Sequence, residues 1–255
     1  MTKSLLFWLH IKKSAGITIR DLLKPHYAET DRENFPISFI QADTIHYNDI
    51  VNNYRTPFGK YYNKRALFAK KFLYKDHWDR LYKLVFAREP ISRTKSMFYY
   101  LFWKSSRSRH DLSTIGTISN YLKITLKTKK FLFDQHYAFD AFLDLVEMSH
   151  ATSTVYSPLN LEFVTHVTPM YDDITDSNGN FLIDNIYKLE NLRDGILDMH
   201  QKLSTNYDPR LLDDSKRLNS RKLKLDINLY KSQILKIKNY LIKIFKYMKM
   251  QNKLN

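Results

Sequence analysis

The sequence predicts an α/β protein of three layers, in which helices flank a mainly parallel central sheet. Short apolar, aromatic-rich runs occupy Leu5–Ile11, Leu81–Ala87 and Phe181–Leu189, and such runs are typical of strands that are buried on both faces. A helical segment follows each run along the chain. This alternation of strand and helix favours parallel pairing and therefore the α/β class.

The boundaries of the first elements follow from the residues between them. The small and polar stretch Lys12–Gly16 ends the first strand, and a helix is expected over Ile17–Lys24 until Pro25 stops it. The second strand leads directly into a helix with Pro90 in its first turn, where proline is favoured. This helix is expected to extend to about Trp103.

The later part of the chain shows further helical and turn patterns. Helices are expected at 117–125, 138–149 and 192–203, a turn at Asp176–Gly179 and a polar loop at Pro209–Lys224. A long amphipathic helix closes the chain, with a predicted apolar stripe of Tyr230, Ile234, Ile237, Leu241, Phe245 and Met248. No repeat or linker divides the sequence, so residues 1–255 are expected to form a single domain.

The composition excludes several classes of protein. With 44% hydrophobic residues among 255, the chain is too apolar to be wholly disordered. It has no cysteine, which excludes disulfides, thiolate metal ligands and cysteine nucleophiles. Apolar runs such as Met97–Trp103 are shorter than the roughly 18 residues of a membrane helix, and Leu5–Leu9 is too short for a signal peptide. A soluble, cytoplasmic protein is expected.

Basic residues are concentrated near the carboxyl terminus. The chain has a formal net charge of +15, and residues 216–255 contain twelve Lys and Arg against one acid, Asp226. Such a region suits nucleic acid, an anionic membrane surface or an acidic polymer. A solvated, lysine-rich helix face explains the same residues, and the sequence leaves both interpretations open.

The first candidate site is His10–Thr18, which joins the first predicted strand to its helix. Backbone N–H groups at a helix N-terminus attract anions, and the small residues Ser14–Gly16 let an anion approach the backbone. Lys13 adds a positive charge and Thr18 a hydroxyl donor. The stretch lacks the G-x-x-x-x-G-K-[ST] pattern of a Walker A loop. It predicts a phosphate-type cradle, with an ordinary strand–helix turn as the alternative.

The second candidate site follows the second strand, in the stretch Phe86–Ser96 (FAREPISRTKS). Arg88 lies where that strand ends, at the edge where α/β proteins gather ligands. Ser96 lies about two helical turns further on and can face the same crevice. Arginine binds phosphate oxygens through two N–H groups, and serine supplies a neutral donor. A helix start with surface arginines is the alternative.

Together, the two stretches resemble the nucleotide-binding elements of sulfotransferases that use 3′-phosphoadenosine 5′-phosphosulfate (PAPS), in particular the Golgi-type and bacterial carbohydrate sulfotransferase families. His10–Thr18 (HIKKSAGIT) is similar to the family pattern H-I-P-K-T-G-G-T-S, and Phe86–Ser96 to F-x-R-x-P-x-x-R-x-x-S. Asn178–Leu192 is similar to a downstream stretch, D-G-x-x-x-V-D-x-I-x-R-x-E-N-L, and Arg217–Lys222 to a late N-x-S-basic loop shortened by one residue.

The resemblance implies a P-loop-NTPase-like sulfotransferase fold and transfer of a sulfuryl group from PAPS to an acceptor hydroxyl, with 3′-phosphoadenosine 5′-phosphate (PAP) as product. It implies that Lys13 stabilises the leaving phosphate and that Arg88 and Ser96 bind the 3′-phosphate. Ser220 and Arg221 are implied to close over the nucleotide. The residues implied to line the 5′-phosphosulfate loop are Lys12, Lys13, Ser14, Ala15, Gly16, Ile17 and Thr18.

Three positions depart from the family pattern of the first motif. Lys12 replaces the usual proline, Ala15 a frequent glycine and Ile17 a hydroxyl residue. The last change removes one side-chain donor. The backbone donors survive all three changes, so the prediction of the cradle is kept.

The sequence does not single out the general base that would deprotonate the acceptor hydroxyl. Family members take a His or Glu from between the two nucleotide motifs, and some place a His in the neighbourhood that corresponds to Tyr61–Arg65, which contains none. We predict His46 as the catalytic base, with His26, Glu29 or Asp43 as alternatives. His77 is interpreted as a packing residue at the entrance of the second strand.

The remaining expectations concern partners. No metal-ligand pattern such as H-E-x-x-H occurs, and lysine, arginine and helix N-termini can neutralise the developing charge, so no metal is expected. The acceptor is expected to be a glycan or another hydroxyl-bearing molecule, held by variable inserts at about 26–80 and 104–176. Whether it is anionic, and whether the basic C-terminal region meets a membrane surface, stays open.

Two other functions are weighed against this one. A P-loop-like phosphoryl transferase (kinase) would need the Walker A glycines and an acidic metal ligand, which the sequence lacks. A non-catalytic basic module for nucleic acid or anionic polymer would explain the C-terminal lysines but not the two strand-end motifs. No nucleic-acid partner is therefore expected.

Overall fold

The computed structural model describes residues 5–23, 48, 50–52, 58–103, 135–151, 161–204 and 227–241. The chain packs as two compact units. The first comprises Met1–Glu89 and Asp172–Leu223, and the second comprises Pro90–Tyr171 and Lys224–Asn255. Neither unit is shown to fold alone, so the single domain stays a prediction.

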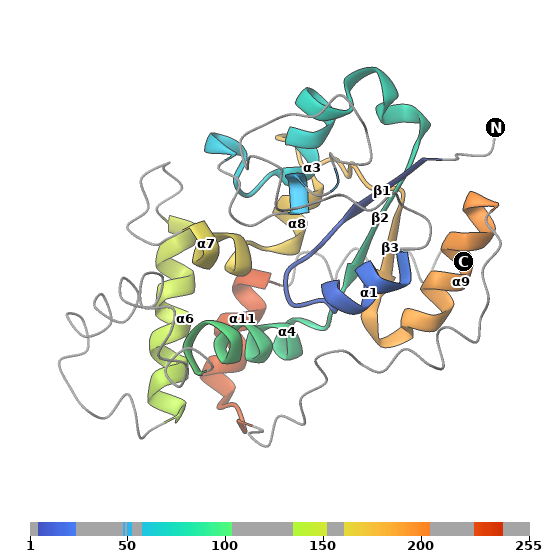
Figure 1. The fold of residues 1–255 in the computed structure, drawn as a ribbon. Helices are drawn as coiled ribbons and strands as arrows, with labels where there is room; N and C mark the ends of the chain where they lie inside the picture. Colours follow the sequence, from blue (N-terminus) through green and yellow to red (C-terminus); the bar gives the residue numbers. More distant parts are fainter. Residues whose placement is uncertain are drawn as a thin grey trace, which may run out of the picture. The chain divides into compact units, whose positions relative to one another are not determined.

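The first unit contains a parallel sheet, drawn as arrows in Figure 1. Its strands, in the spatial order β1-β2-β3, are β1 (Leu5–Leu9), β2 (Leu81–Ala87) and β3 (Asn185–Lys188). Leu9 lies opposite Val85, and Ala87 lies opposite Lys188. The carboxyl ends of all three strands therefore lie at one edge of the sheet, which confirms the predicted α/β class.

Helices and aromatic side chains cover the two faces of this sheet. On one face, α1 (Gly16–Leu23) and α9 (Leu192–Leu203) pack Ile19 and Ile196 into a core with Phe86. On the other face, the ring of Phe7 lies 5.4 Å from that of Tyr74 and 5.1 Å from that of Trp78. All seven residues of β2 are buried as a result, as expected for a strand covered on both sides.

Two asparagine side chains take the place of a neighbouring strand along the edge of β1. Asn48 accepts a hydrogen bond from Trp8 N–H (3.2 Å) and donates one to Leu6 C=O (3.0 Å). Asn52 accepts from His10 N–H (2.7 Å) and donates to Trp8 C=O (2.9 Å). These four bonds satisfy backbone groups that β2 does not reach.

The rest of the first unit consists of short helical turns. They are η2 (Gly59–Tyr61), α3 (Arg65–Phe68), the π-helix η3 (Ala69–Leu73), η4 (Lys75–Arg80) and η7 (Leu189–Asn191), and α8 (Met170–Ile174) crosses the boundary between the units. The predicted turn at Asp176–Gly179 is present: an antiparallel bridge joins Thr175 to Phe181, and Gly179 has a φ of +85°.

The described part of the second unit is helical. It contains α4 (Pro90–Phe98), the π-helix η5 (Tyr99–Trp103), α6 (Gln135–Ala151), α7 (Leu161–Val167) and α11 (Lys231–Leu241). Its core is aromatic, since the ring of Phe98 lies 5.2 Å from that of Phe139 and 5.7 Å from that of Phe142. Phe163 packs 6.2 Å from Phe142.

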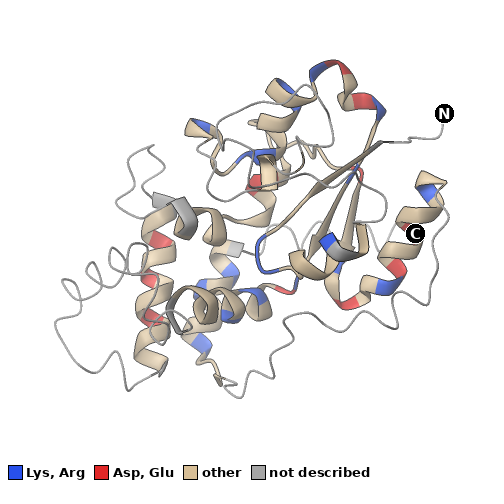
Figure 2. Cartoon of the chain, in the orientation of Figure 1, with Lys and Arg blue, Asp and Glu red and all other residues tan. Residues whose placement is uncertain are grey.

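The charges of α11 are partly compensated within this unit. Figure 2 shows acidic residues along α6 and basic residues along α11, and Lys236 pairs with Asp144 at 2.5 Å. The hydrogen bond to Asp144 raises the pKa of the Lys236 ammonium, and the charges of Asp140 and Glu147 raise it further. At least this lysine of the basic C-terminal region therefore has an acidic partner in its own chain.

The amphipathic pattern predicted for this last helix is wrong in part. Ile237 is buried, but Tyr230 is 56% exposed and Gln233 is fully buried. The amide of Gln233 accepts a hydrogen bond from Tyr230 N–H (3.0 Å) and donates one to Asp140 (3.0 Å). These bonds satisfy the side-chain amide of Gln233, so this polar residue can be buried. Tyr230 is not part of a buried stripe, and its ring stacks on that of His136 with 4.3 Å between the centroids.

Candidate functional site

The loop that joins β1 to α1 has an unusual backbone. Lys13 and Ala15 both have positive φ angles, 67° and 53°, which side-chain-bearing residues adopt at a cost of about 1–3 kcal/mol each. Ser14 N–H donates to Ile11 C=O (3.2 Å) and closes a turn within the loop. This strained turn follows the carboxyl end of β1 and leads straight into α1.

The first turn of α1 presents backbone donors at the end of this loop. The bond from Ile19 N–H to Ala15 C=O (3.0 Å) begins the helical ladder, so the N–H groups of Gly16, Ile17 and Thr18 precede it. Such groups, at the positive end of a helix, favour an anion. These backbone groups fit the predicted cradle, and the binding of an anion there stays a prediction.

Gly16 is required at this position because the imidazole of His10 lies against it. A Cβ atom on Gly16 would lie 1.8 Å from His10 Nε2. The ring also stacks on Trp8, with 5.5 Å between centroids. His10, the first residue of the motif, thus packs beneath the helix start.

The hydroxyl of Ser14 is the polar atom in this loop that lacks compensation. The residue is 1% exposed, and its Oγ has no hydrogen-bond partner among the described residues. A buried hydroxyl without a partner costs about 1–3 kcal/mol. A ligand with acceptor oxygens at the loop would satisfy it, so this residue fits the phosphosulfate group of the predicted donor.

The second motif meets the first through Arg88. Its Nη1 donates to the carbonyl of Lys13 (3.3 Å), which lies 75 positions away in the sequence. Burial lowers the pKa of the Arg88 guanidinium, and the charges of Glu190 and Glu89 oppose that shift. Arginine stays protonated in proteins, so a half-buried positive charge lies at this edge of the sheet.

The third family-like stretch reaches the same place. The carboxylate of Glu190, in η7 directly after β3, accepts a hydrogen bond from Glu89 N–H (3.1 Å). Lys13 after β1 and Glu190 after β3 therefore both interact with Arg88, which directly follows β2.

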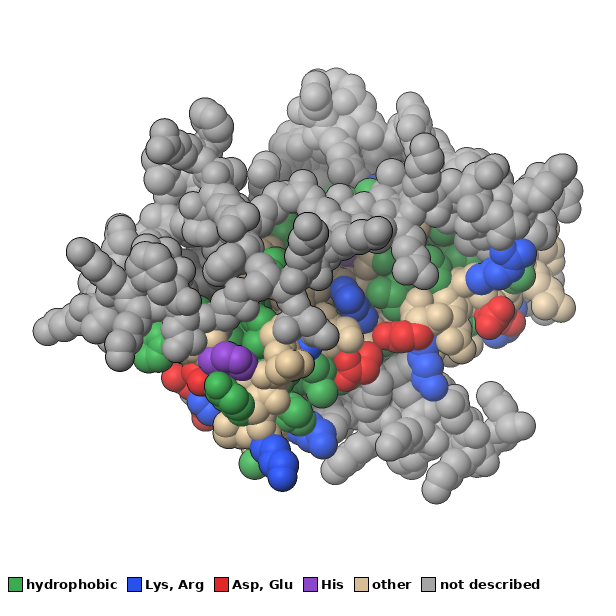
Figure 3. Space-filling model, turned by 90° about the horizontal axis from the view of Figure 1, so that it is seen from below, with side chains coloured by type: hydrophobic (Ala, Val, Ile, Leu, Met, Phe, Trp, Pro, Cys, Tyr) green, Lys and Arg blue, Asp and Glu red, His purple; other side chains and the backbone are tan. Residues whose placement is uncertain are grey.

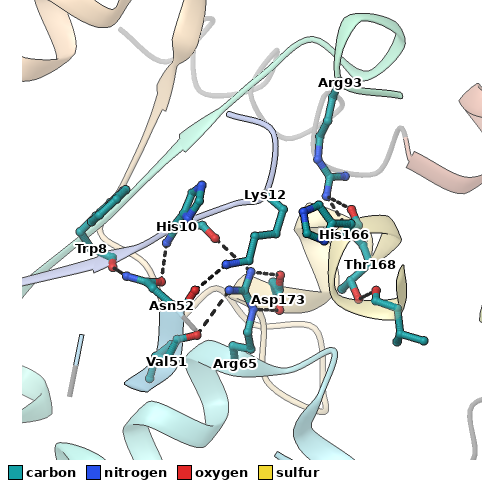
Figure 4. A network of polar contacts seen from close by, with 11 residues as sticks. Trp8, His10, Lys12, Val51, Asn52, Arg65, Arg93, His166, Thr168 and Asp173 are labelled. Atoms are coloured by element: carbon teal, nitrogen blue, oxygen red, sulfur yellow. Dashed lines mark hydrogen bonds and ion pairs between the residues drawn. The ribbon is translucent and has the colours of Figure 1, made fainter. Parts of the chain in front are cut away.

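Further polar contacts hold the chain where it enters the loop after β1 (Figure 4). Arg65 donates through Nη2 to His10 C=O (3.2 Å) and is paired with Asp173 at 2.6 Å. Lys12 is 4% exposed, and its Nζ donates to Asn52 C=O. This contact gives Lys12 a role in supporting the loop, and its contact with a donor stays a prediction.

The other predicted site residues lie in the second unit or outside the described residues. Ser96 is a half-buried residue of α4, in the second unit. Arg93, the second arginine of the motif, is 1% exposed and donates to the carbonyls of His166 (2.9 Å) and Thr168 (3.0 Å) at the end of α7. It caps that helix. His46, Ser220 and Arg221 lie outside the described residues.

The interpretation of His77 as a packing residue is wrong. The side chain is exposed and contacts Arg80, whereas the neighbouring Trp78 is buried at 3% exposure. His77 lies in η4, before the amino end of β2, so the seven residues of β2 separate it from Arg88. At about 3.3 Å per residue, that is roughly 20 Å.

The described residues contain neither a membrane-spanning helix nor a cluster of metal-ligating side chains. No helix among them is long and apolar enough to cross a membrane. No group of three or more His, Asp or Glu side chains among them is placed to hold a metal ion. The absence of a metal from the reaction stays a prediction.

The first unit is thus an α/β structure, in which a loop with two positive φ angles joins the carboxyl end of β1 to the start of α1. The chain matches the family model described as "Sulfotransferase family" over residues 2–247. It belongs to the sulfotransferase family, which confirms the predicted resemblance and identifies the chain as a transferase of sulfuryl groups. No curated protein and no solved structure matches the chain.

Sequence reasoning missed the residues that support the loop. Arg65 and Asp173 are separated by 108 positions, and nothing in their local sequence indicates a pair. Asn48 and Asn52 have a weak signal, since a spacing of four puts two amides on one face of a helix.

Proposed function

We propose that the chain transfers a sulfuryl group from PAPS to a hydroxyl of a saccharide or glycoconjugate. The observation that supports this donor best is the bond from Arg88 to the Lys13 carbonyl, which brings two motifs together at the carboxyl edge of the sheet. PAPS has anionic groups at both its 5′ and 3′ positions, and the two motifs offer a cationic residue each.

In this proposal, the loop and the arginine hold opposite ends of the donor. The hydroxyl of Ser14 and the backbone amides at the start of α1, including that of Thr18, bind the 5′-phosphosulfate. Arg88 and Ser96 bind the 3′-phosphate, as the family resemblance implies. Ser220 and Arg221 close over the nucleotide.

The proposed step is an in-line displacement at sulfur. The acceptor oxygen attacks sulfur, the bond between sulfur and the bridging oxygen of the 5′-phosphate breaks, and PAP leaves with the electron pair. Lys13 and the helix amides neutralise the negative charge that grows on the leaving phosphate. His46 takes the proton of the acceptor hydroxyl. A general base is most effective when its pKa lies near the working pH, and histidine meets this condition near neutral pH.

An aromatic surface in the first unit supports a saccharide acceptor. The rings of Tyr61, Phe68 and Phe72 lie within 6.0 Å of one another pairwise, and Phe72 is 43% exposed. The ammonium groups of Lys60 and Lys71 lie 5.5 and 5.9 Å from the centroid of Tyr61. An exposed ring in an aromatic cluster beside lysines suits an acidic sugar. Cytoplasmic location and peripheral membrane contact stay predictions.

The basic binding module has less support. On the face seen from below in Figure 3, the Lys and Arg side chains of the described residues lie beside Asp and Glu side chains. Nucleic-acid sites instead gather positive charge on one face.

Ligand-induced stabilisation separates the candidate functions. We expect PAP to raise the melting temperature in proportion to the logarithm of its concentration, since a ligand that binds the native state stabilises it. ATP with Mg²⁺ and a mixed-sequence oligonucleotide are the comparison ligands. Stabilisation by ATP–Mg²⁺ alone would support a kinase, and stabilisation by the oligonucleotide alone would support the basic module.

Transfer of labelled sulfate from PAPS onto a panel of neutral glycans, acidic glycans, lipids and phenols tests the acceptor. Within this assay, His46→Ala should lower turnover by about 10²–10⁴ without changing the affinity for PAP. His77→Ala is the matched control, because this histidine lies at the other end of β2 from Arg88. The reverse ranking of the two variants would exclude His46 as the base.

A further inference from the structure

The loop after β1 adopts a backbone that needs support from outside. Lys13 and Ala15 have φ angles of 67° and 53°, and such residues persist only where their surroundings over-determine them. The loop itself contributes the bond from Ser14 N–H to Ile11 C=O. Neighbouring elements have to supply the rest.

Arg65, the first residue of α3, supplies support where the chain enters this loop (Figure 4). Its Nη2 donates to the carbonyl of His10 (3.2 Å) and its Nη1 to the carbonyl of Val51 (3.5 Å). Asp173 holds the guanidinium in place, with 2.9 Å between Nε and Oδ1 and 2.6 Å between Nη2 and Oδ2. Because the guanidinium is planar and rigid, these two bonds fix the direction in which Nη2 meets His10.

The surroundings make this pair a fixed anchor. The side chains of Arg65 and Asp173 are 1% and 2% exposed. Lys64, the preceding residue, donates to Thr175 Oγ1 (3.0 Å) and to the carbonyl of Asp176 (3.2 Å). The start of α3 is thereby bonded both to α8 with the turn that follows it and to the end of β1.

Stability alone does not account for a buried ion pair. Apolar side chains of the same volume often give equal or greater stability, because two charges lose their hydration on burial. A guanidinium and a carboxylate offer something that apolar groups lack, namely bonds of fixed direction to a backbone carbonyl.

We infer that Arg65 and Asp173 form a positioning pair, which holds the carbonyl of His10 and so keeps the loop from Lys12 to Gly16 in the conformation that binds the sulfuryl donor. The inference rests on the proposed donor site. Neither residue of the pair touches the donor in it; both act through the backbone.

The test uses Arg65→Lys, which keeps the positive charge and loses the planar fork, and Asp173→Asn, which keeps the shape and loses the charge. The expected result is a rise of about 10- to 100-fold in the dissociation constant for PAP, the size of loss typical when a group that orients a ligand-binding residue is removed. Calorimetric titration measures it. Amide hydrogen exchange of peptides covering residues 10–18 should become faster in both variants.

Asp184→Asn is the matched control. Asp184 pairs with the buried ammonium of Lys83 at 3.3 Å, near the amino end of β2, so this variant also removes a carboxylate from an ion pair of the first unit. It should change the affinity for PAP by less than about twofold and leave exchange in residues 10–18 unchanged.

Unchanged affinity and unchanged loop exchange in Arg65→Lys would overturn the inference, and so would an equal loss in Asp184→Asn. If Asp173→Asn does not fold, Arg65→Lys decides alone. If the unaltered protein binds no PAP, the proposed function fails, and the exchange rates of residues 10–18 still decide: faster exchange in Arg65→Lys supports the positioning pair, and unchanged exchange overturns it.

Discussion

Replacing Gly16 by alanine forces a methyl group into the imidazole of His10. The added Cβ would lie 1.8, 2.2 and 2.4 Å from Nε2, Cε1 and Cδ2 of that ring, far inside the roughly 3.5–4.0 Å of favourable contact. The ring cannot move without giving up its stacking on Trp8, and the backbone of His10 is held by Asn52 and Arg65. Overpacking of this kind costs about 1–3 kcal/mol. With a urea m-value of about 2 kcal/mol/M, the midpoint of unfolding should fall by about 0.5–1.5 M.

A double-mutant cycle with His10→Ala tests this reasoning. Without the imidazole the methyl group meets no clash, so Gly16→Ala should cost nothing there or gain up to about 1 kcal/mol, since alanine suits a helix better than glycine. Gly195→Ala is the control, because its Cβ would lie 2.9 Å from Phe86 and 3.0 Å from Tyr187, and it should cost the same with and without His10. An equal cost of Gly16→Ala in both backgrounds would refute the assigned clash.

Four further changes test the site and the fold. Lys13→Ala should lower sulfuryl transfer by about 10²–10³ without unfolding the protein; turnover near that of the unaltered protein would remove Lys13 from the site. Arg88→Ala should weaken binding of PAP about ten- to a hundredfold more than binding of adenosine 5′-phosphosulfate, which lacks the 3′-phosphate; equal losses would show that the bond to the Lys13 carbonyl is its whole role. Ser14→Ala should leave urea stability unchanged or raise it, because the hydroxyl has no partner among the described residues, and should weaken PAP binding; a clear loss of stability would contradict the unsatisfied hydroxyl. Hydrogen bonds from the Asn180 side chain and backbone hold the pKa of Asp176 below its ordinary value. The ionised carboxylate therefore stabilises the fold at a pH above the unfolded-state pKa, and this stabilisation is lost as the pH falls through the folded-state pKa. In urea titrations, Asp176→Asn should reduce the loss of stability below about pH 4, and an unaltered acid profile would count against this role of Asp176.

The local pattern of apolar residues predicts an element correctly where a single buried run or a single helix face determines it. The buried run Leu81–Ala87 forms β2 residue for residue, and Leu192–Leu203 does the same for α9. The third strand is shorter than the predicted Phe181–Leu189, because the first part of that run turns back: Leu182 N–H bonds to the carbonyl of Ile174 (2.9 Å) before β3 begins. Within this run Leu182 and Ile183 are buried and the four residues of β3 are half-buried, so strand pairing, and not apolar character alone, decided where the strand lies.

Local pattern failed where a distant partner decides. Gln233 is buried because its side-chain amide donates to Asp140, and Arg65 meets the carbonyl of His10 in an orientation that Asp173 fixes. In both cases a buried polar residue depends on a partner that is distant in the sequence, and the spacing of apolar residues does not indicate that partner. The loop between β1 and α1 was predictable, since small and polar residues directly after an apolar run require no knowledge of the rest of the chain, and its binding of a donor stays a prediction.

The two amides along β1 also govern how this sheet can associate with other chains. A strand whose outer N–H and C=O groups are unbonded is a template for a strand of another molecule. The side chains of Asn48 and Asn52 bond these N–H and C=O groups of β1. An amide side chain offers no row of backbone donors and acceptors with which a further strand could pair. Replacing both by alanine would therefore leave the outer N–H and C=O groups of β1 unbonded next to the loop after β1, and we expect that variant to form oligomers or fibrils more readily.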